Sequence, residues 1–307
     1  MLKSCVPRLS GKEFQLNRKV WPRAVRVAYL PASLIPVLAG LDITWRIRAA
    51  VDWELFGLTL LGVALAHISA DLFNEYFDYK HGTDQLARER GLSGGSGLIT
   101  EAGASPANVL RGALVTMGLA VGFGLYLALE RGALVLVLMA FGAASIFLYT
   151  SVLQRLGFGE ATLAVERVAT VLGTVYVQTL SLNWIAFYAG AVLGLLSIYT
   201  VYYAAFPDYQ ADLPTGKRTI VVSLGPRRAA RLLFLVPLSC YAILIATVTV
   251  GILPEAELLC LLFIPLFIFS IWELRGDKPE QNNLRRGLRV TSIAARGFGL
   301  LLAIALI

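Results

Sequence analysis

The chain has 307 residues, of which 57% are hydrophobic and only 15% are charged, and its mean hydropathy is +0.69. Soluble domains carry about 25% charged residues, so this composition excludes an ordinary soluble enzyme and indicates an integral membrane protein. Because a helix needs roughly 20 apolar residues to cross the hydrocarbon core, the length leaves no room for a large extramembrane domain. The net charge of +7 does not indicate nucleic-acid binding, since the basic residues lie between the apolar runs.

Apolar runs of helical length predict nine membrane crossings in one all-α domain, a multi-spanning transmembrane helical bundle of residues 1–307. In chain order the runs are 26–41, 55–78, 107–129, 132–153, 161–181, 184–205, 230–250, 256–273 and 288–306. Basic residues are concentrated before the first run and after the second, fourth, sixth and eighth. Cytoplasmic loops retain positive charge, so we expect a cytoplasmic N-terminus and a C-terminus on the opposite side. Two cytoplasmic loops, about 79–106 and 206–229, are longer than a hairpin needs.

The three cysteines, Cys5, Cys240 and Cys260, share no close spacing, and two of them lie in apolar runs. This arrangement argues against a zinc site or a disulfide framework. We expect them to behave as small buried hydrophobic side chains.

Acidic and amide side chains gather where the second predicted helix meets the first long loop. Spacings of three and four residues place Asp71, Asn74 and Asp78 on one helical face. Gly82 allows the helix to end, so we expect Asp84 to reach the same region from the loop. The first acidic cluster therefore consists of Asp71, Asn74, Asp78 and Asp84.

The second long loop begins with another pair of carboxylates. This second acidic cluster contains two residues one helical turn apart, Asp208 and Asp212. Pro214 and Gly216 are expected to break the helix there. The break would bring Lys217 and Arg218 beside the two carboxylates.

Several carboxylates at membrane depth repel one another and are costly to desolvate, so they require cations. Mg²⁺ fits because it takes one or two carboxylates, keeps waters and completes its shell with phosphate oxygens. The two clusters therefore predict a site for a Mg²⁺-bound diphosphate, with Lys217 and Arg218 offsetting the remaining phosphate charge. The alternative is that these acidic residues only solvate helix ends, which explains one cluster more readily than two.

At these residues the chain resembles the UbiA superfamily of intramembrane prenyltransferases. That family has Asn-x-x-x-Asp with a further Asp after its second helix, which Asn74, Asp78 and Asp84 match. It has Asp-x-x-x-Asp after its sixth helix, which Asp208 and Asp212 match. The chain looks most similar to the 1,4-dihydroxy-2-naphthoate polyprenyltransferases of menaquinone biosynthesis, through segments 74–84, 97–100, 149–150, 157–160, 173–179 and 216–220.

The resemblance implies a helical bundle around a central polar cavity, in the inner membrane of a prokaryotic cell. It implies Mg²⁺-dependent transfer of a polyprenyl group from polyprenyl diphosphate to an aromatic acceptor, 1,4-dihydroxy-2-naphthoate, with release of pyrophosphate. The catalytic metal ligands would be Asp78, Asp84, Asp208 and Asp212. Asn74 would ligate the metal or orient the substrate.

The chain departs from that branch at two places. Residues 204–207, Ala-Ala-Phe-Pro, stand where the branch has Asn-Asn-x-Arg, and 92–97 lacks the usual Pro and Arg. Both segments lie where diphosphate or acceptor would be held. A different acceptor, 4-hydroxybenzoate or another quinone or lipid precursor, is therefore the main alternative.

Other residues have both a functional and a structural interpretation. Arg155 is either a diphosphate ligand or a cytoplasmic loop charge. Tyr149 and Tyr176 either face a carbocation with their rings or fill space in the bundle. Glu166 and Arg167 lie inside the fifth predicted helix, where charges are costly, and either pair with each other or contact substrate.

Gln178 lies three helical turns beyond Arg167 on the same face, so we expect this helix to line a polar cavity. The candidate substrate-binding residues are Asn74, Lys217, Arg218, Arg155, Tyr149 and Gln178. His67, one turn before Asp71, receives no role. The run 93–97, Ser-Gly-Gly-Ser-Gly, either presents backbone N–H groups to phosphate or forms a flexible lid.

A secondary transporter is the competing class, because carriers also bury acidic residues. Carrier sites lie near the membrane midplane at broken helices of inverted repeats. Here the acidic residues lie at cytoplasmic helix ends and no repeat is visible. The pattern therefore favours an enzyme.

Overall fold

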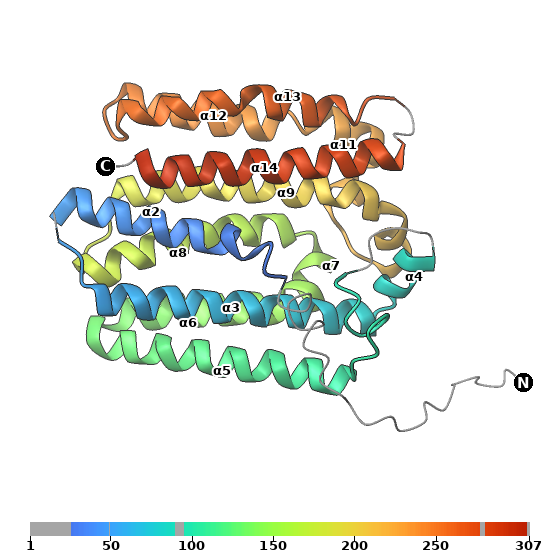
Figure 1. The fold of residues 1–307 in the computed structure, drawn as a ribbon, viewed down its shortest axis with the longest axis horizontal. Coiled ribbons are helices and arrows are strands. Elements are labelled where there is room, and N and C mark those ends of the chain that lie inside the picture. The colour runs from blue at the N-terminus through green and yellow to red at the C-terminus, as the bar shows by residue number, and fades with distance from the viewer. Residues whose placement is uncertain (1–25, 49, 90–94, 277–279, 306–307) are drawn as a thin grey trace, which may run out of the picture.

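The structure, a computed structural model, describes residues 26–48, 50–89, 95–276 and 280–305. Regular structure in these ranges is entirely helical, as the apolar runs predict (Figure 1). The elements are α2 (Leu30–Arg48), α3 (Trp53–Lys80), α4 (Thr83–Glu89), α5 (Pro106–Arg131), α6 (Ala133–Leu148), η1 (Tyr149–Leu153), α7 (Gln154–Leu156), α8 (Gly159–Thr179), α9 (Trp184–Thr215), α10 (Ile220–Leu224), α11 (Pro226–Leu232), α12 (Leu235–Thr249), η2 (Glu255–Phe263), α13 (Ile264–Trp272) and α14 (Gln281–Ala305).

Each predicted crossing corresponds to helix in the described part of the chain, and eight helical segments are long and apolar enough to span a membrane. The remaining one, α8, has 21 residues but carries Glu160, Glu166 and Arg167, which lower its hydropathy. It packs against α2, α3, α6 and α9 in the interior of the bundle. This polar crossing is therefore shielded by more apolar neighbours.

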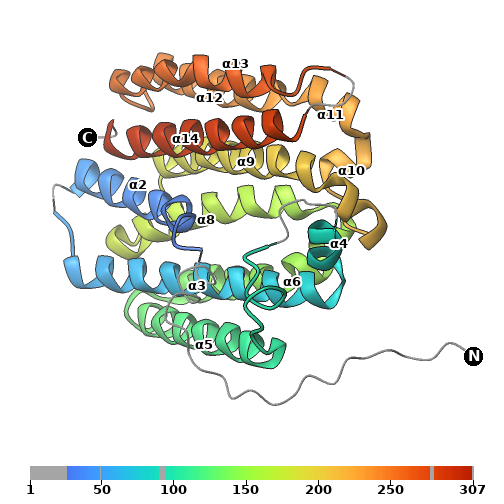
Figure 2. The same cartoon turned by 45° about the vertical axis from the view of Figure 1, so that its right-hand side comes forward.

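The bundle is arranged in layers around α2, α8, α9 and α14 (Figures 1 and 2). On one side lie α3, α5 and α6, and on the other α12 and α13 pack on α9 and α14. The short helices α4 and α10 lie at one end, and α14 finishes at the opposite end (Figure 2). We call the end with α4 and α10 the cap end.

Close contact between α8 and α9 fixes the centre of the bundle. A Cβ at Gly190 would lie 2.8 Å from the Val168 Cα atom, and one at Gly194 would lie 2.9 Å from the Ala164 carbonyl oxygen. Glycine at both positions lets the two backbones approach closely. This packing sets the polar residues of α8 directly against α9.

Two predicted loops contain more helix than expected. The loop expected at about 206–229 begins as helix, because α9 runs through Pro207 and continues beyond the predicted crossing to Thr215, next to the break predicted at Pro214 and Gly216. The helix ends where Gly216 adopts a left-handed conformation with φ of +81°. The first long loop likewise contains the helix α4.

Cys240 and Cys260 are buried, as predicted for small hydrophobic side chains, and both are free thiols. Cys5 lies outside the described residues.

Candidate active site

A cavity of about 960 Å³ runs through the bundle between α3, α5, α6, α8 and α9. Its walls are apolar along α5 and α6, where residues such as Met117, Phe123 and Met139 line it. Toward the cap end, carboxylate side chains line the cavity. The cavity is therefore suited to a ligand with a long apolar part and a charged head.

The first acidic cluster lines this cavity as the helical spacing predicts. Asp71, Asn74 and Asp78 face it from α3, and Asp84 faces it from the first turn of α4. The Asn74 side-chain oxygen accepts a hydrogen bond of 2.8 Å from the Thr150 hydroxyl. That bond fixes the amide on the cavity wall.

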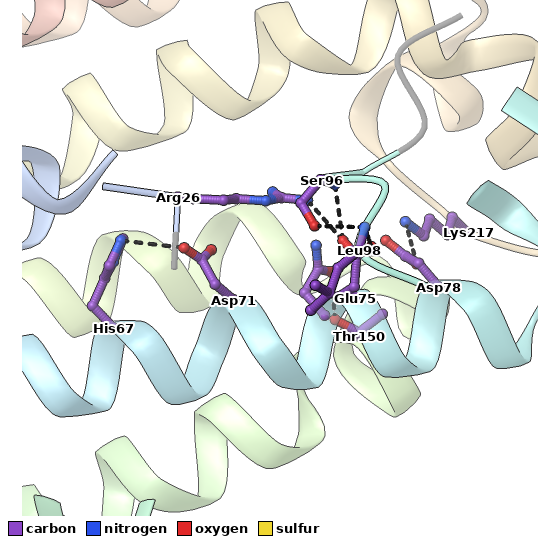
Figure 3. A network of polar contacts seen from close by, with 10 residues as sticks. Arg26, His67, Asp71, Glu75, Asp78, Ser96, Leu98, Thr150 and Lys217 are labelled. Atoms are coloured by element: carbon purple, nitrogen blue, oxygen red, sulfur yellow. Dashed lines mark hydrogen bonds and ion pairs between the residues drawn. The ribbon is translucent and has the colours of Figure 1, made fainter. Parts of the chain in front are cut away.

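The second acidic cluster lines the same cavity from α9, although more than 120 residues separate it from the first. Lys217 connects the two clusters, because the chain turns back after Gly216. The Lys217 Nζ atom lies 2.7 Å from the Asp78 Oδ1 atom (Figure 3). The same Nζ atom lies 3.8 Å from the Asp212 Oδ1 atom. The cap end of the cavity thus joins carboxylates and one buried cation in a single site.

Burial and neighbouring charge shift the pKa values of Lys217 and Asp84, which lie outside the crossings. Burial lowers the pKa of Lys217, but the carboxylates of Asp78 and Asp212 outweigh it and hold the pKa above its ordinary value. Burial, reinforced by the charges of Asp78 and Glu75, raises the pKa of Asp84 to about 7. The site therefore favours an added cation beside Asp84.

Two carboxylate oxygens support a metal-binding role. The Asp84 Oδ2 and Asp208 Oδ1 atoms are buried and have no hydrogen-bond partner, and such atoms are costly unless a cation or donor reaches them. Among the described residues, no three His, Cys, Asp or Glu side chains form a metal cage by themselves. The donor set fits Mg²⁺, which binds one or two carboxylates and takes its other ligands from water and phosphate.

The sequence interpretation missed Glu75. This buried carboxylate accepts hydrogen bonds from the backbone N–H groups of Ser96 (2.9 Å) and Leu98 (3.0 Å), and the Arg26 guanidinium lies 3.7 Å away (Figure 3). The Ser96 N–H group, which belongs to the glycine-rich run considered for phosphate, therefore binds a protein carboxylate. Helical geometry could have indicated a separate role for Glu75. It follows Asn74 directly, and a helix turns adjacent residues to different faces, so Glu75 was not expected to act with Asn74.

The sequence matches the family described as the UbiA prenyltransferase family over residues 33–293, which is most of the chain. The chain belongs to the UbiA prenyltransferase family. It is 30% identical to the 1,4-dihydroxy-2-naphthoate octaprenyltransferase of Mycobacterium tuberculosis, over 69% of this chain and 72% of that protein. It is 27% identical to the Bacillus subtilis protein of the same name, over 66% of this chain and 65% of that protein.

Solved structures of UbiA homologues have the same fold. A homologue from Archaeoglobus fulgidus bound to GPP and Mg²⁺ aligns with a TM-score of 0.65 at 15% identity, covering 92% of this chain and 99% of that one. The apo structure of a homologue from Aeropyrum pernix aligns with a TM-score of 0.69 at 14% identity, covering 90% and 98%. The predicted helical-bundle fold is confirmed, and the protein is a membrane prenyltransferase.

Two basic residues predicted for this prenyltransferase's diphosphate site lie elsewhere. The Arg218 side chain is exposed, and neither it nor Arg155 is among the described residues that line the cavity. Arg155 donates a 3.2 Å hydrogen bond to the Thr215 carbonyl at the end of α9. Only Lys217 of the predicted cations points into the site, because the turn after Gly216 directs adjacent side chains apart.

Gln178 was predicted to bind substrate, and the structure gives it a structural role instead. Its side-chain oxygen accepts from the Asp52 N–H (2.9 Å) and its side-chain nitrogen donates to the Asp52 carbonyl (3.0 Å). The side chain thus joins α8 to the start of α3, at the end opposite the cap. Tyr149 lines the cavity as expected, whereas Tyr176 is not among the described lining residues.

We expect Gly95→Ala to reduce prenyl transfer strongly. Gly95 has a φ of +58°, and a Cβ atom there would lie 2.8 Å from the Asp84 Oδ2 atom and 2.9 Å from the Glu75 Oε2 atom. The matched control is Gly103→Ala, since Gly103 has a φ of +69° but open space at its Cβ position. Both variants should lose about 1 kcal/mol of stability from backbone strain, and only Gly95→Ala should lose activity. Thermal unfolding of both variants is measured in parallel. Equal activity in the two variants would contradict the claim that Gly95 leaves the space that the Asp84 and Glu75 carboxylates need.

Proposed function

We propose that this protein transfers a polyprenyl group from polyprenyl diphosphate to 1,4-dihydroxy-2-naphthoate and releases pyrophosphate. The observation that carries the proposal is the convergence of two acidic clusters and Lys217 on the cap end of an otherwise apolar cavity. A polyprenyl diphosphate has the matching form, with a charged head and an apolar tail.

Mg²⁺ would be held against the diphosphate by Asp78, Asp84, Asp208 and Asp212. Asn74 would ligate the metal or orient the substrate. When bound, the metal supplies Lewis-acid stabilisation of the phosphate charge. Lys217 would bind the departing pyrophosphate, since its ammonium group already lies between the two clusters. The carbon–oxygen bond of the allylic diphosphate would break with both electrons going to pyrophosphate. A ring carbon of the acceptor would then form the new carbon–carbon bond, and the ring would regain aromaticity by losing the substituent of that carbon, a proton or, at the carboxylate-bearing carbon, CO₂.

The cavity walls protect the allylic cation that this bond cleavage produces. Apolar side chains from α5 and α6 keep water away from it. The Tyr149 ring lies on the same wall and would stabilise positive charge through its π face. Hydrolysis of the donor is thereby suppressed until an acceptor is present.

The choice of acceptor is supported by relatives named 1,4-dihydroxy-2-naphthoate octaprenyltransferase in two genera. The donor and the metal are supported by the structural neighbour bound to GPP and Mg²⁺. The competing carrier interpretation does not explain why the carboxylates gather at one end of the cavity. We further propose that the cap end faces the cytoplasm in a prokaryotic inner membrane, because basic residues predominate in the loops at that end.

The acceptor is tested by product analysis. Purified protein is incubated with octaprenyl diphosphate and Mg²⁺, with dihydroxynaphthoate or 4-hydroxybenzoate in parallel. A prenylated naphthalene product detected by mass supports the proposal, and prenylated hydroxybenzoate alone would overturn the choice of acceptor.

We expect Gly142→Leu to shorten the donor that the enzyme accepts. Gly142 lines the apolar part of the cavity, and its Cβ position faces open space, so a leucine side chain would project into the tail's path. The control is Gly118→Leu, because Gly118 also has open space but is exposed on the outer face of α5. Activity with octaprenyl diphosphate should fall about tenfold in Gly142→Leu, with geranyl diphosphate little affected. Equal losses of activity with octaprenyl and geranyl diphosphate would refute the claim that the polyprenyl tail passes Gly142.

A further inference from the structure

A polar group in the middle of the cavity has no part in the diphosphate site. Its centre is Arg167 on α8, whose Nε atom donates to the Ser197 hydroxyl at 3.0 Å and whose Nη1 atom donates to the Ser33 hydroxyl at 3.4 Å. Ser33 is also 2.8 Å from the His67 Nδ1 atom. These four residues come from four helices, α2, α3, α8 and α9, and all line the cavity.

Two helices independently place this group deeper than the diphosphate site. Ser197 precedes Asp208 on α9 by eleven residues, and His67 precedes Asp78 on α3 by eleven. At 1.5 Å per residue, each pair is separated by about 16 Å along its helix. A diphosphate held at the cap end therefore leaves Arg167 for another ligand.

No described carboxylate forms an ion pair with Arg167. Its neighbour Glu166 accepts a 2.5 Å hydrogen bond from Ser145 instead. The Asp71 Oδ2 atom lies 3.4 Å from the His67 Nε2 atom, and Glu75 forms an ion pair with Arg26. A charged group at membrane depth is retained where it binds an ion, a substrate or a partner.

The Arg167 guanidinium, which has no ion-pair partner among the described residues, indicates an anionic ligand. A guanidinium has five N–H donors, and Arg167 uses two of them in these bonds, so others are free to bind a planar carboxylate. Arg296 from α14 also lines the cavity and adds positive charge. The donor's apolar tail gains nothing from either cation.

We propose that Arg167 binds the carboxylate of the aromatic acceptor, with Ser33 and Ser197 holding the guanidinium in place. This inference rests on the proposed function, because it assumes a carboxylate-bearing acceptor. Anchored there, the ring lies between Arg167 and the acidic clusters, with its electron-rich carbons toward the breaking bond. The anchor selects aromatic carboxylates over neutral phenols of the same shape, because a neutral ring leaves Arg167 without an anion.

The test compares Arg167→Met with Arg167→Lys, using dihydroxynaphthoate and its neutral analogue 1,4-dihydroxynaphthalene as acceptors. We expect Arg167→Met to raise the KM for dihydroxynaphthoate about 10- to 100-fold, with the KM for the prenyl diphosphate unchanged. Arg167→Lys should recover part of this loss because it restores the charge. The control is Arg228→Gln, since Arg228 is exposed on α11 away from the cavity.

The neutral analogue separates anchoring from folding. The wild-type protein should prefer the carboxylate, and Arg167→Met should lose that preference while using the neutral ring as well as the wild type does. An unchanged acceptor KM in Arg167→Met, or an equal loss with both acceptors, would overturn the anchor. Failure of the wild type to prenylate any carboxylate acceptor would instead overturn the proposed function.

Discussion

Asp78→Asn and Asp212→Asn are each expected to abolish prenyl transfer while leaving the protein folded in the membrane. Each substitution keeps the side chain's shape and removes one of the charges that meet at the cap end of the cavity. The loss should be at least about 10³-fold in kcat, since these charges hold the metal and diphosphate that stabilise the departing group.

The measurement is product formation at saturating Mg²⁺, with thermal unfolding of the detergent-purified variants as a check of folding. Glu54→Gln is the control, because Glu54 is an exposed acid in the first turn of α3, far from the cap end. Wild-type activity in both aspartate variants would refute the assignment of the two clusters to one metal–diphosphate site.

Lys217→Met should lower kcat/KM for the prenyl diphosphate about 100-fold. Lys217 is a buried cation that contacts carboxylates of both clusters, and its loss removes a positive charge placed to bind pyrophosphate. The adjacent Arg218→Met offers a matched comparison, because the Arg218 side chain is exposed. We expect Arg218→Met to change kcat/KM less than about threefold.

Equal losses in the two variants would mean that net charge near the cap end, and not the position of the Lys217 ammonium group, supports activity. Such a result would contradict the assignment of Lys217 as the pyrophosphate ligand.

Periodic features of the chain were predictable from sequence. The helical spacing correctly placed Asp71, Asn74 and Asp78 on the cavity wall, because residues three and four apart share a face whatever the rest of the fold does. The lengths of the apolar runs located the crossings, because a helix needs roughly 20 apolar residues to span the hydrocarbon core. The end of α9 at Thr215, capped by Gly216, agrees with the helix break predicted at Pro214 and Gly216.

The direction of an isolated side chain was not predictable. Arg155, Lys217 and Arg218 are all basic and close to the cap end, yet only Lys217 points into the cavity. The backbone turn at each residue decides the direction of its side chain, and the amino-acid composition carries no information about that direction. Gln178 has the expected helical phase relative to Arg167, but contacts with Asp52 at the far end of α8 take up its hydrogen bonds.

The pairing of distant segments was the other feature that the sequence could not provide. The contact between Lys217 and Asp78 crosses from the segment after α9 to α3, and the contacts of Glu75 with Ser96 and Leu98 hold residues 96–98 against α3. Both depend on how the helices pack. The resemblance to a known family indicated which residues matter without showing these contacts.

The most direct test of the central claim is pyrophosphate release by the purified wild-type protein with octaprenyl diphosphate, with and without Mg²⁺ and with and without dihydroxynaphthoate. We predict release only when the metal and the acceptor are both present, and none from Asp212→Asn under the same conditions. Release that is independent of Mg²⁺, or that Asp212→Asn retains, would contradict a metal–diphosphate site built from the two acidic clusters.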